Sequence, residues 1–232
     1  DVERTLSILE GLGIRAEACK RVLDLPVRGG TREKVSRELR SLGLDTSRML
    51  VGVHPGSVLA TKRWSAEGFA RLIGTLKQRY PCEILLFGGP DDAAVIAEVQ
   101  ELCGGCGVSL VDRIALHELP AALGLCSVLI TNDSGPMHIA VAEGVPVVAI
   151  FCATTPSLGF YPYSSKAIVL EKDLPCRPCS AHGGRRCPLG TEDCIRLIGP
   201  EQVYRAVAQL LDGTTRPDIE VANRFLPQFI RV

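Results

Sequence analysis

The sequence lacks an excess of charge of either sign, because its 26 Lys and Arg residues are balanced by 26 Asp and Glu residues. Nucleic-acid binding rests largely on clustered positive charge, so that class of protein is disfavoured. No apolar run approaches the roughly 18–20 residues that span a bilayer. The pattern G-x-x-x-x-G-K-S/T is also missing, which leaves a P-loop ATPase unsupported.

What the sequence does have is the composition of a globular enzyme, with 46% hydrophobic and 22% charged residues. The chain begins at Asp1 rather than Met, so we expect it to be a piece of a longer protein. Its 10 cysteines in 232 residues are too sparse for a disulfide scaffold. Cys82, Cys126 and Cys152 stand in or beside apolar runs, where we expect buried free thiols and therefore a reducing compartment.

Apolar runs alternate with segments of helical spacing through the middle of the chain. This alternation is typical of βα units that build a parallel sheet buried on both faces. We therefore predict a doubly wound α/β domain, Rossmann-like, over residues 44–212. The expected strands are 49–54, 82–87, 108–111, 127–131, 145–151 and 167–170, and the expected helices are 65–80, 91–103, 116–124 and 134–143.

The two ends of the chain have a different pattern. Residues 1–43 contain two helical segments, Arg4 to Leu12 and Arg32 to Leu44, joined by a stretch with Pro and Gly. The tail, 213–232, opens with a Gly-Thr-Thr-Arg-Pro linker signal and then carries apolar residues that we expect to pack on a neighbour. Those apolar residues are Phe225, Leu226, Phe229 and Ile230.

The loop after the 127–131 strand is the first candidate site, because ligands of open parallel sheets bind at the carboxyl ends of the strands. Ser134 and Gly135 begin a helix whose free N–H groups form an anion site, and Gly135 allows close approach of a phosphate. Asp133 would repel a pyrophosphate, so a sugar hydroxyl is its expected partner. The structural alternatives are an ordinary N-cap for Asp133 or Ser134 and a core role for His138.

Two further strand ends carry small and polar residues. The loop that begins with His54-Pro55-Gly56-Ser57 leads to Lys62, which could reach a phosphate as a point charge or be an ordinary solvated lysine. Asp91 and Asp92 follow a Gly-Gly pair and could bind a ribose diol or stabilise the start of a helix.

Three stretches together resemble glycosyltransferase family 9, the ADP-heptose:lipopolysaccharide heptosyltransferases. They are HPGSVLATKRWSAEGFARL at 54–72, ILLFGGPDD at 84–92 and LITNDSGPMHIAVAEGVPVVAIF at 129–151. The resemblance implies the donor-binding, C-terminal half of the two-domain GT-B architecture at 44–212. It makes 1–43 the end of the acceptor domain and the connector. The implied donor-binding residues are Ser57, Lys62, Asp91, Ile114, Asp133, Ser134, Gly135 and His138.

The resemblance also implies a reaction: inverting transfer of heptose from ADP-heptose to the lipopolysaccharide inner core, without a required metal. The implied general base is an aspartate of the N-terminal domain, which this chain lacks. We therefore assign no catalytic base here and expect the chain to bind donor without transferring sugar. The expected location is the cytoplasm, either free or peripheral to the inner membrane, with no nucleic-acid partner.

Four cysteines gather in the loop 176–194. The spacing Cys176-x2-Cys179-x7-Cys187-x6-Cys194 offers four thiolates for a structural zinc site. An iron–sulfur cluster fits less well, because the spacing matches no ferredoxin pattern. Disulfides or reduced thiols without metal remain alternatives. Cys103-Gly104-Gly105-Cys106 ends a helical segment, so a helix-ending turn is expected there rather than a redox motif.

Three alternative functions stay open from the sequence. The first is a nucleotide-sugar-binding module without transfer activity, and the second is a GT-B transferase that uses a UDP- or GDP-sugar. The third makes the cysteine-rich loop the functional centre, as a zinc-held interaction or redox module, but leaves the three polar strand ends unexplained.

Overall fold

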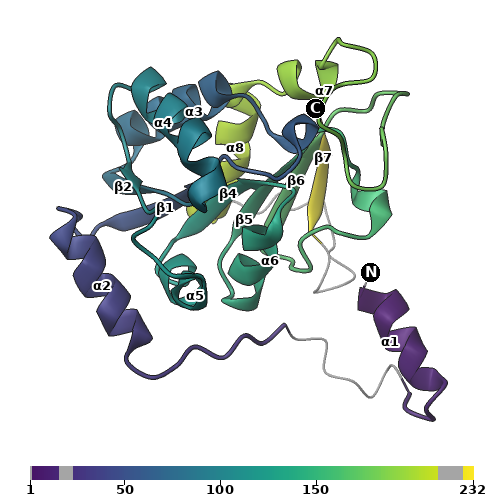
Figure 1. Ribbon diagram of the computed structural model, residues 1–232, viewed down its shortest axis with the longest axis horizontal. Helices are drawn as coiled ribbons and strands as arrows, with labels where there is room; N and C mark the ends of the chain where they lie inside the picture. Colours follow the sequence, from purple (N-terminus) through teal and green to yellow (C-terminus); the bar gives the residue numbers. More distant parts are fainter. Residues whose placement is uncertain (1, 16–22, 214–226) are drawn as a thin grey trace.

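All strands of the central sheet run parallel in the computed structural model, which describes residues 2–15, 23–213 and 227–232. Within these residues seven strands form one sheet in the order β3-β2-β1-β4-β5-β6-β7 (Figure 1). The strands are β1 (Met49–His54), β2 (Cys82–Leu86), β3 (Val108–Ser109), β4 (Val128–Asn132), β5 (Val147–Phe151), β6 (Ala167–Glu171) and β7 (Gln228–Arg231).

Helices follow the strands as the alternating pattern predicts. They are α1 (Val2–Glu10), α2 (Thr31–Ser41), α3 (Ala66–Arg79), α4 (Ala93–Leu102), α5 (Leu119–Leu123), α6 (Gly135–Ala142), α7 (Asp193–Arg196) and α8 (Pro200–Leu211). The 3-10 turns are η2 (Ala60–Lys62), η3 (Pro90–Asp92), η4 (Leu116–Glu118) and η5 (Pro156–Leu158). The Ser65 hydroxyl caps α3 by accepting from the Gly68 N–H at 3.0 Å, as expected of an N-cap serine.

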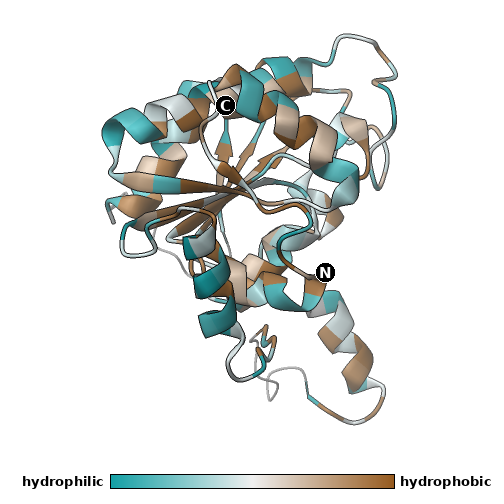
Figure 2. Cartoon of the chain, turned by 60° about the vertical axis from the view of Figure 1, so that its left-hand side comes forward, coloured by the Kyte–Doolittle hydropathy of each residue, from teal (hydrophilic) through white to brown (hydrophobic). Residues whose placement is uncertain are grey.

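Two hydrophobic layers cover the two faces of the sheet. One layer joins the strands to α3, α4 and α8 through residues such as Phe69, Ile96 and Val203. The other joins them to α2, α5 and α6 through residues such as Leu39 and Met137. Figure 2 shows the result as hydrophobic strands enclosed by helices with hydrophilic outer faces. The predicted doubly wound α/β fold is therefore confirmed.

The segment before residue 44 divides into two parts. Helix α2 packs against α5, and its Leu39 side chain is completely buried in the second layer. Residues 31–43 therefore share the core of the domain that the sequence pattern begins at residue 44. Helix α1 lies beyond the edge of the sheet in Figure 1.

The end of the chain adds a strand that the sequence pattern did not predict. β7 pairs with β6 in parallel, and Ile230 packs against the first hydrophobic layer. Phe229 instead contacts Tyr161 edge-on, with ring centroids 5.7 Å apart. Phe225 and Leu226, also expected to pack, lie outside the described residues. The described part of the chain holds no helix long and apolar enough to cross a membrane.

Candidate functional site

The strand order reverses between β1 and β4, and this reversal creates a crevice at the carboxyl ends of the strands. A cavity of about 680 Å³ lies there, which is the size range of small-molecule sites. One part of its wall is apolar and consists of Phe87, Leu110, Ile114, Leu116, Leu119 and Ile139. The other part is polar and includes His54, Ser57, Arg63, Asp91, Asp92, Ser134 and Gly135.

Five of the eight predicted donor-binding residues line this cavity: Ser57, Asp91, Ile114, Ser134 and Gly135. Ile114 stands in the apolar part and Asp91 is exposed beside it. An ideal Cβ on Gly135 would meet no atom within 4 Å, so the backbone of the first turn of α6 is open to approach. The cavity wall therefore combines apolar side chains, polar side chains and accessible backbone at the start of α6.

Lys62, Asp133 and His138 are not part of the cavity wall but form a second group beside it. The Lys62 Nζ lies 2.8 Å from Oδ2 of the buried Asp133. The Thr154 hydroxyl donates to the same carboxylate oxygen at 2.7 Å. Asp133 thus orients the ammonium group at the end of η2, while Thr154 orients Asp133.

His138 lies within the electrostatic reach of this pair. Burial lowers the pKa of His138 below its ordinary value, Asp133 opposes that shift and Lys62 adds to it. The imidazole is therefore neutral at pH 7. It offers a hydrogen-bonding group to the site and no positive charge.

His54, at the end of β1, connects two walls of the cavity. Its Nδ1 lies 3.2 Å from Oγ of Ser134, and its Nε2 lies 3.7 Å from Oδ2 of Asp92. The interaction with His54 is the main cause that lowers the pKa of Asp92, so that carboxylate stays ionised. Ser134 stands at the N-cap of α6 but makes no capping bond, because its hydroxyl turns toward His54 and Thr131.

Asp92 is held more tightly than its neighbour Asp91. A Cβ on Gly56 would lie 2.1 Å from the Asp92 carboxylate, so only glycine fits there. Asp92 Oδ2 also accepts from the Gly89 N–H at 3.1 Å. The helix expected from residue 91 consequently begins with the turn η3, and α4 starts at Ala93. Asp91 remains free to face a ligand.

Asn132 ties the loop after β1 to the end of β4. Its Nδ2 donates to the carbonyls of Pro55 at 2.8 Å and Gly56 at 3.2 Å, and its Oδ1 accepts from the Trp64 N–H at 2.9 Å. Neither Asn132 nor His54 is predicted as a site residue from the sequence. The feature of the sequence that could have identified them is their position, because each is the last residue of a central strand.

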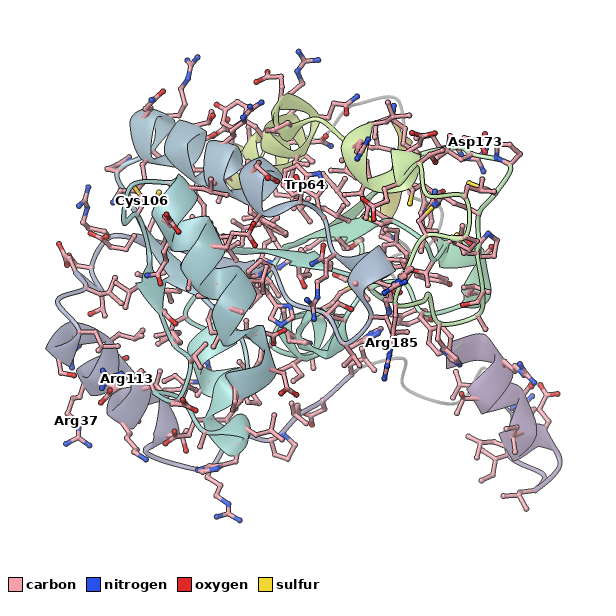
Figure 3. The ribbon with its side chains drawn as sticks, turned by 45° about the horizontal axis from the view of Figure 1, so that its top comes forward. Arg37, Trp64, Cys106, Arg113, Asp173 and Arg185 are labelled. Carbon is pink, nitrogen blue, oxygen red and sulfur yellow. The ribbon has the colours of Figure 1, made fainter. Side chains whose placement is uncertain are left out.

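The cysteine-rich loop 176–194 folds beside the ends of β5 and β6, and Figure 3 shows yellow sulfur atoms grouped near the labelled Asp173. Burial raises the pKa of Cys194 to about 11, and the other three thiols of the loop add to that shift. Backbone N–H groups, chiefly that of Glu192, lower the pKa of Cys187. Among the described residues, no group of three or more His, Cys, Asp or Glu side chains stands in a metal-holding arrangement.

The cysteines outside this loop have the environments that the sequence predicts. The nine cysteines in the described ranges are all free, and Cys82, Cys126 and Cys152 are buried. Cys103 is the C-cap of α4, and Gly104 and Gly105 adopt positive φ angles of 69° and 80°. The expected helix-ending turn at this C-x-x-C is therefore confirmed.

Fold and crevice together define the class: a Rossmann-like domain of a GT-B glycosyltransferase. The model of "Glycosyltransferase family 9 (heptosyltransferase)" matches residues 2–188, and the chain belongs to this family. Lipooligosaccharide heptosyltransferase 2 of Campylobacter jejuni serotype O:6 is 29% identical, over 72% of this chain and 53% of its own. The chain spans about half the length of the curated relatives it matches.

Solved structures agree with this assignment. A glycosyl transferase family 9 protein from Veillonella parvula has a TM-score of 0.77 and 31% identity, over 89% of this chain and 58% of that one. The iron-containing dodecameric heptosyltransferase TibC of enterotoxigenic E. coli H10407, solved in complex with ADP-D-β-D-heptose, shares the fold. Its TM-score is 0.55 at 20% identity, over 74% of this chain and 49% of that one.

Proposed function

We propose that this chain is the donor-binding half of an inverting heptosyltransferase that moves heptose from ADP-heptose to the lipopolysaccharide inner core. The observation that carries the proposal is the two-part cavity at the switch point between β1 and β4. A nucleotide sugar has the same division, with a flat apolar base at one end and a charged diphosphate at the other. Family membership and the ADP-heptose complex of TibC support this donor.

In this proposal the adenine enters the apolar slot beside Ile114, and the ribose faces Asp91. The diphosphate faces the Ser134 hydroxyl and the Gly135 N–H at the start of α6. As the bond to the sugar breaks, negative charge develops on the departing ADP. Preorganised N–H groups and cations stabilise such charge without moving.

Two cations stand beside the proposed diphosphate position. Arg63 lines the cavity and is fixed by its Nε, which donates to the Ser57 carbonyl at 2.7 Å. Lys62 is held by Asp133 and supplies the second charge. With these groups in place, transfer would require no metal. The general base would come from the N-terminal half of the protein, so this chain alone would bind donor without transferring sugar.

We also propose that the four thiols of the cysteine-rich loop hold a structural zinc ion. Cys176, Cys179 and Cys187 all act electrostatically on the Cys194 thiol, and backbone N–H groups favour the Cys187 thiolate, which suits a metal ligand. Since TibC is iron-containing, iron is the second metal to measure. Metal analysis of the purified chain should find about one ion per chain and none after Cys176→Ser. A metal-free wild-type chain with four reactive thiols would remove this proposal.

The free thiols further support a reducing, cytoplasmic location. Heptose transfer to a lipid-linked acceptor would then take place at the cytoplasmic face of the inner membrane.

The donor proposal is tested by isothermal titration of the 232-residue chain with ADP, GDP, UDP and NAD. We expect ADP to bind most tightly and to raise the melting temperature by mass action. Lys62→Ala should weaken ADP binding about tenfold, because one charge-assisted contact is lost. Arg37→Ala is the matched control: it removes an exposed cation of α2, labelled in Figure 3, that is not part of the cavity wall, and it should leave binding unchanged.

The other possible results of this titration, and of a transfer assay, lead to different conclusions. Preference for UDP or GDP would keep the fold and change the donor. If the folded chain bound none of the four nucleotides, the donor-binding proposal would be wrong. Sugar transfer by the chain alone would show that its base lies within these residues.

A further inference from the structure

The tip of the cysteine-rich loop reaches the edge of the candidate donor site. The Gly184 N–H donates to Oγ1 of Thr61 at 2.7 Å, and that hydroxyl donates in turn to the Gly184 carbonyl at 2.9 Å. The Thr61 N–H donates to the same carbonyl at 3.1 Å. Thr61 is buried, so these three bonds form a closed link between segments 123 residues apart.

This link lies directly beside Lys62. Thr61 and Lys62 are neighbours in the turn η2, and the Ala153 N–H donates to the Thr61 carbonyl from the end of β5 at 3.2 Å. On Gly183, a Cβ would lie 2.8 Å from Cγ of Lys62. The aliphatic stem of Lys62 therefore packs on the bare backbone of Gly183 while its ammonium group meets Asp133.

The loop is fixed at its base as well as at its tip. The Arg177 side chain is 2% exposed and pairs with Glu171 at 3.2 Å. Its guanidinium also donates to the carbonyls of Phe151, Cys152, Thr154 and Lys172, which belong to the ends of β5 and β6. A tip held from such an anchored base has a defined position against η2.

We propose that Gly183, Gly184 and Thr61 are positioning residues for Lys62, and that the cysteine-rich loop is thereby a working part of the diphosphate site. The inference rests on the proposed function, because it assigns Lys62 to the donor diphosphate. It predicts that loosening the link weakens recognition of the diphosphate and leaves recognition of the nucleoside intact. A loop that served stability alone would affect both equally.

The test compares ADP with adenosine, which lacks the diphosphate, as ligands of the 232-residue chain. Thr61→Val keeps the shape of the side chain and removes its hydroxyl, so ADP binding should weaken about tenfold. Adenosine binding should stay within about twofold of wild type, a difference of roughly 0.4 kcal/mol. Thr61→Ser restores the hydroxyl and should restore ADP affinity.

A double-mutant cycle with Lys62→Ala supplies the second measurement. If Thr61 acts through Lys62, adding Thr61→Val to Lys62→Ala should weaken ADP binding no further. Additive losses, or equal losses for ADP and adenosine, would overturn the proposal. So would unchanged ADP binding by Thr61→Val.

Two further outcomes are covered by the same design. If Thr61→Val does not fold, Gly183→Ala loosens the link in a second way: its Cβ displaces the Lys62 stem, and it strains the loop tip, where φ is 83°. It should give the same selective loss of ADP affinity. A wild-type chain that binds neither ligand would reject the proposed function, whereas a wild type that binds ADP beside an unaffected Thr61→Val would reject only the positioning role.

Discussion

Single side chains of the crevice are held by partners from other strands. Ser134 shows this most clearly: its hydroxyl does not cap α6 but lies against His54, whose other ring nitrogen faces Asp92. Pro136 has no N–H and the Met137 N–H donates to the Ser134 carbonyl at 3.2 Å, so the Gly135 N–H is the first-turn donor of α6 that is left for a ligand. Both interpretations of Ser134 in the sequence, as N-cap or as ligand group, capture part of its position and neither anticipates the histidine.

A pH dependence of stability follows from His138. Its pKa in the folded chain lies below the ordinary value of 6.5, so the unfolded chain binds the proton first. Stability should therefore fall as the pH decreases from 6.5 toward the folded pKa, and should be independent of this group above 6.5. Melting temperatures between pH 7.5 and pH 5 test this.

The matched variant for that measurement is His138→Gln, which keeps a hydrogen-bonding side chain without a titrating ring. Its melting temperature should change less with acidification than that of wild type. Parallel curves for the two proteins would mean that His138 does not govern the acid sensitivity.

At the scale of the elements, the strands that the apolar runs predicted all exist, because a strand covered on both faces must be apolar throughout. β7 was not predicted, since Gln228–Arg231 is no continuous apolar run and alternates between partly buried and exposed positions. The ends of the helices depended on contacts across the chain. Asp92 turns back to Gly89 and delays α4, which no local pattern reveals.

The candidate site, like the helices and strands, is predictable from local sequence only in part. Ser57, Asp91, Ser134 and Gly135 follow from the rule that ligands bind at the carboxyl ends of strands, and Ile114 follows from the family resemblance. All five line the cavity, and their contact with a donor stays a prediction. The pairing of Lys62 with Asp133, and of Thr61 with Gly184 of the cysteine-rich loop, depends on the register of the sheet. Such partners lie 71 or more residues away in sequence and leave no periodic signal.

Asn132 is the residue whose loss should loosen the crevice as a whole. Asn132→Ala would leave the Trp64 N–H and the Pro55 and Gly56 carbonyls without their buried partner. Each unsatisfied buried group costs about 1–3 kcal/mol, so the free energy of unfolding should fall by at least about 2 kcal/mol. Urea denaturation measures this loss. Unchanged stability would mean that water or backbone rearrangement replaces the amide.

Across the whole molecule, the domain begins earlier than the strand pattern suggests. α2 lies on the sheet face that also carries α5 and α6. Most of its residues are polar, so the sequence pattern did not assign its buried side to the core of the domain. Arg32 and Lys34 on α2 form ion pairs with Glu143 and Glu118, which belong to the segments around α6 and α5. A chain cut at residue 44 would lose these contacts together with the apolar ones.

A comparison of two leucines tests whether this segment belongs to the folding unit. Leu39 is 0% exposed between α2 and the sheet, whereas Leu12 is 74% exposed after α1. Leu39→Ala should lower the free energy of unfolding by about 2–5 kcal/mol, because it removes buried methyl groups and leaves a cavity. Leu12→Ala should change it by less than about 0.5 kcal/mol. Equal effects of the two substitutions would place α2 outside the cooperative core. A loss confined to Leu39 would instead make residues 31–43 part of the unit that carries the crevice, so that any separate donor-binding fragment has to include them.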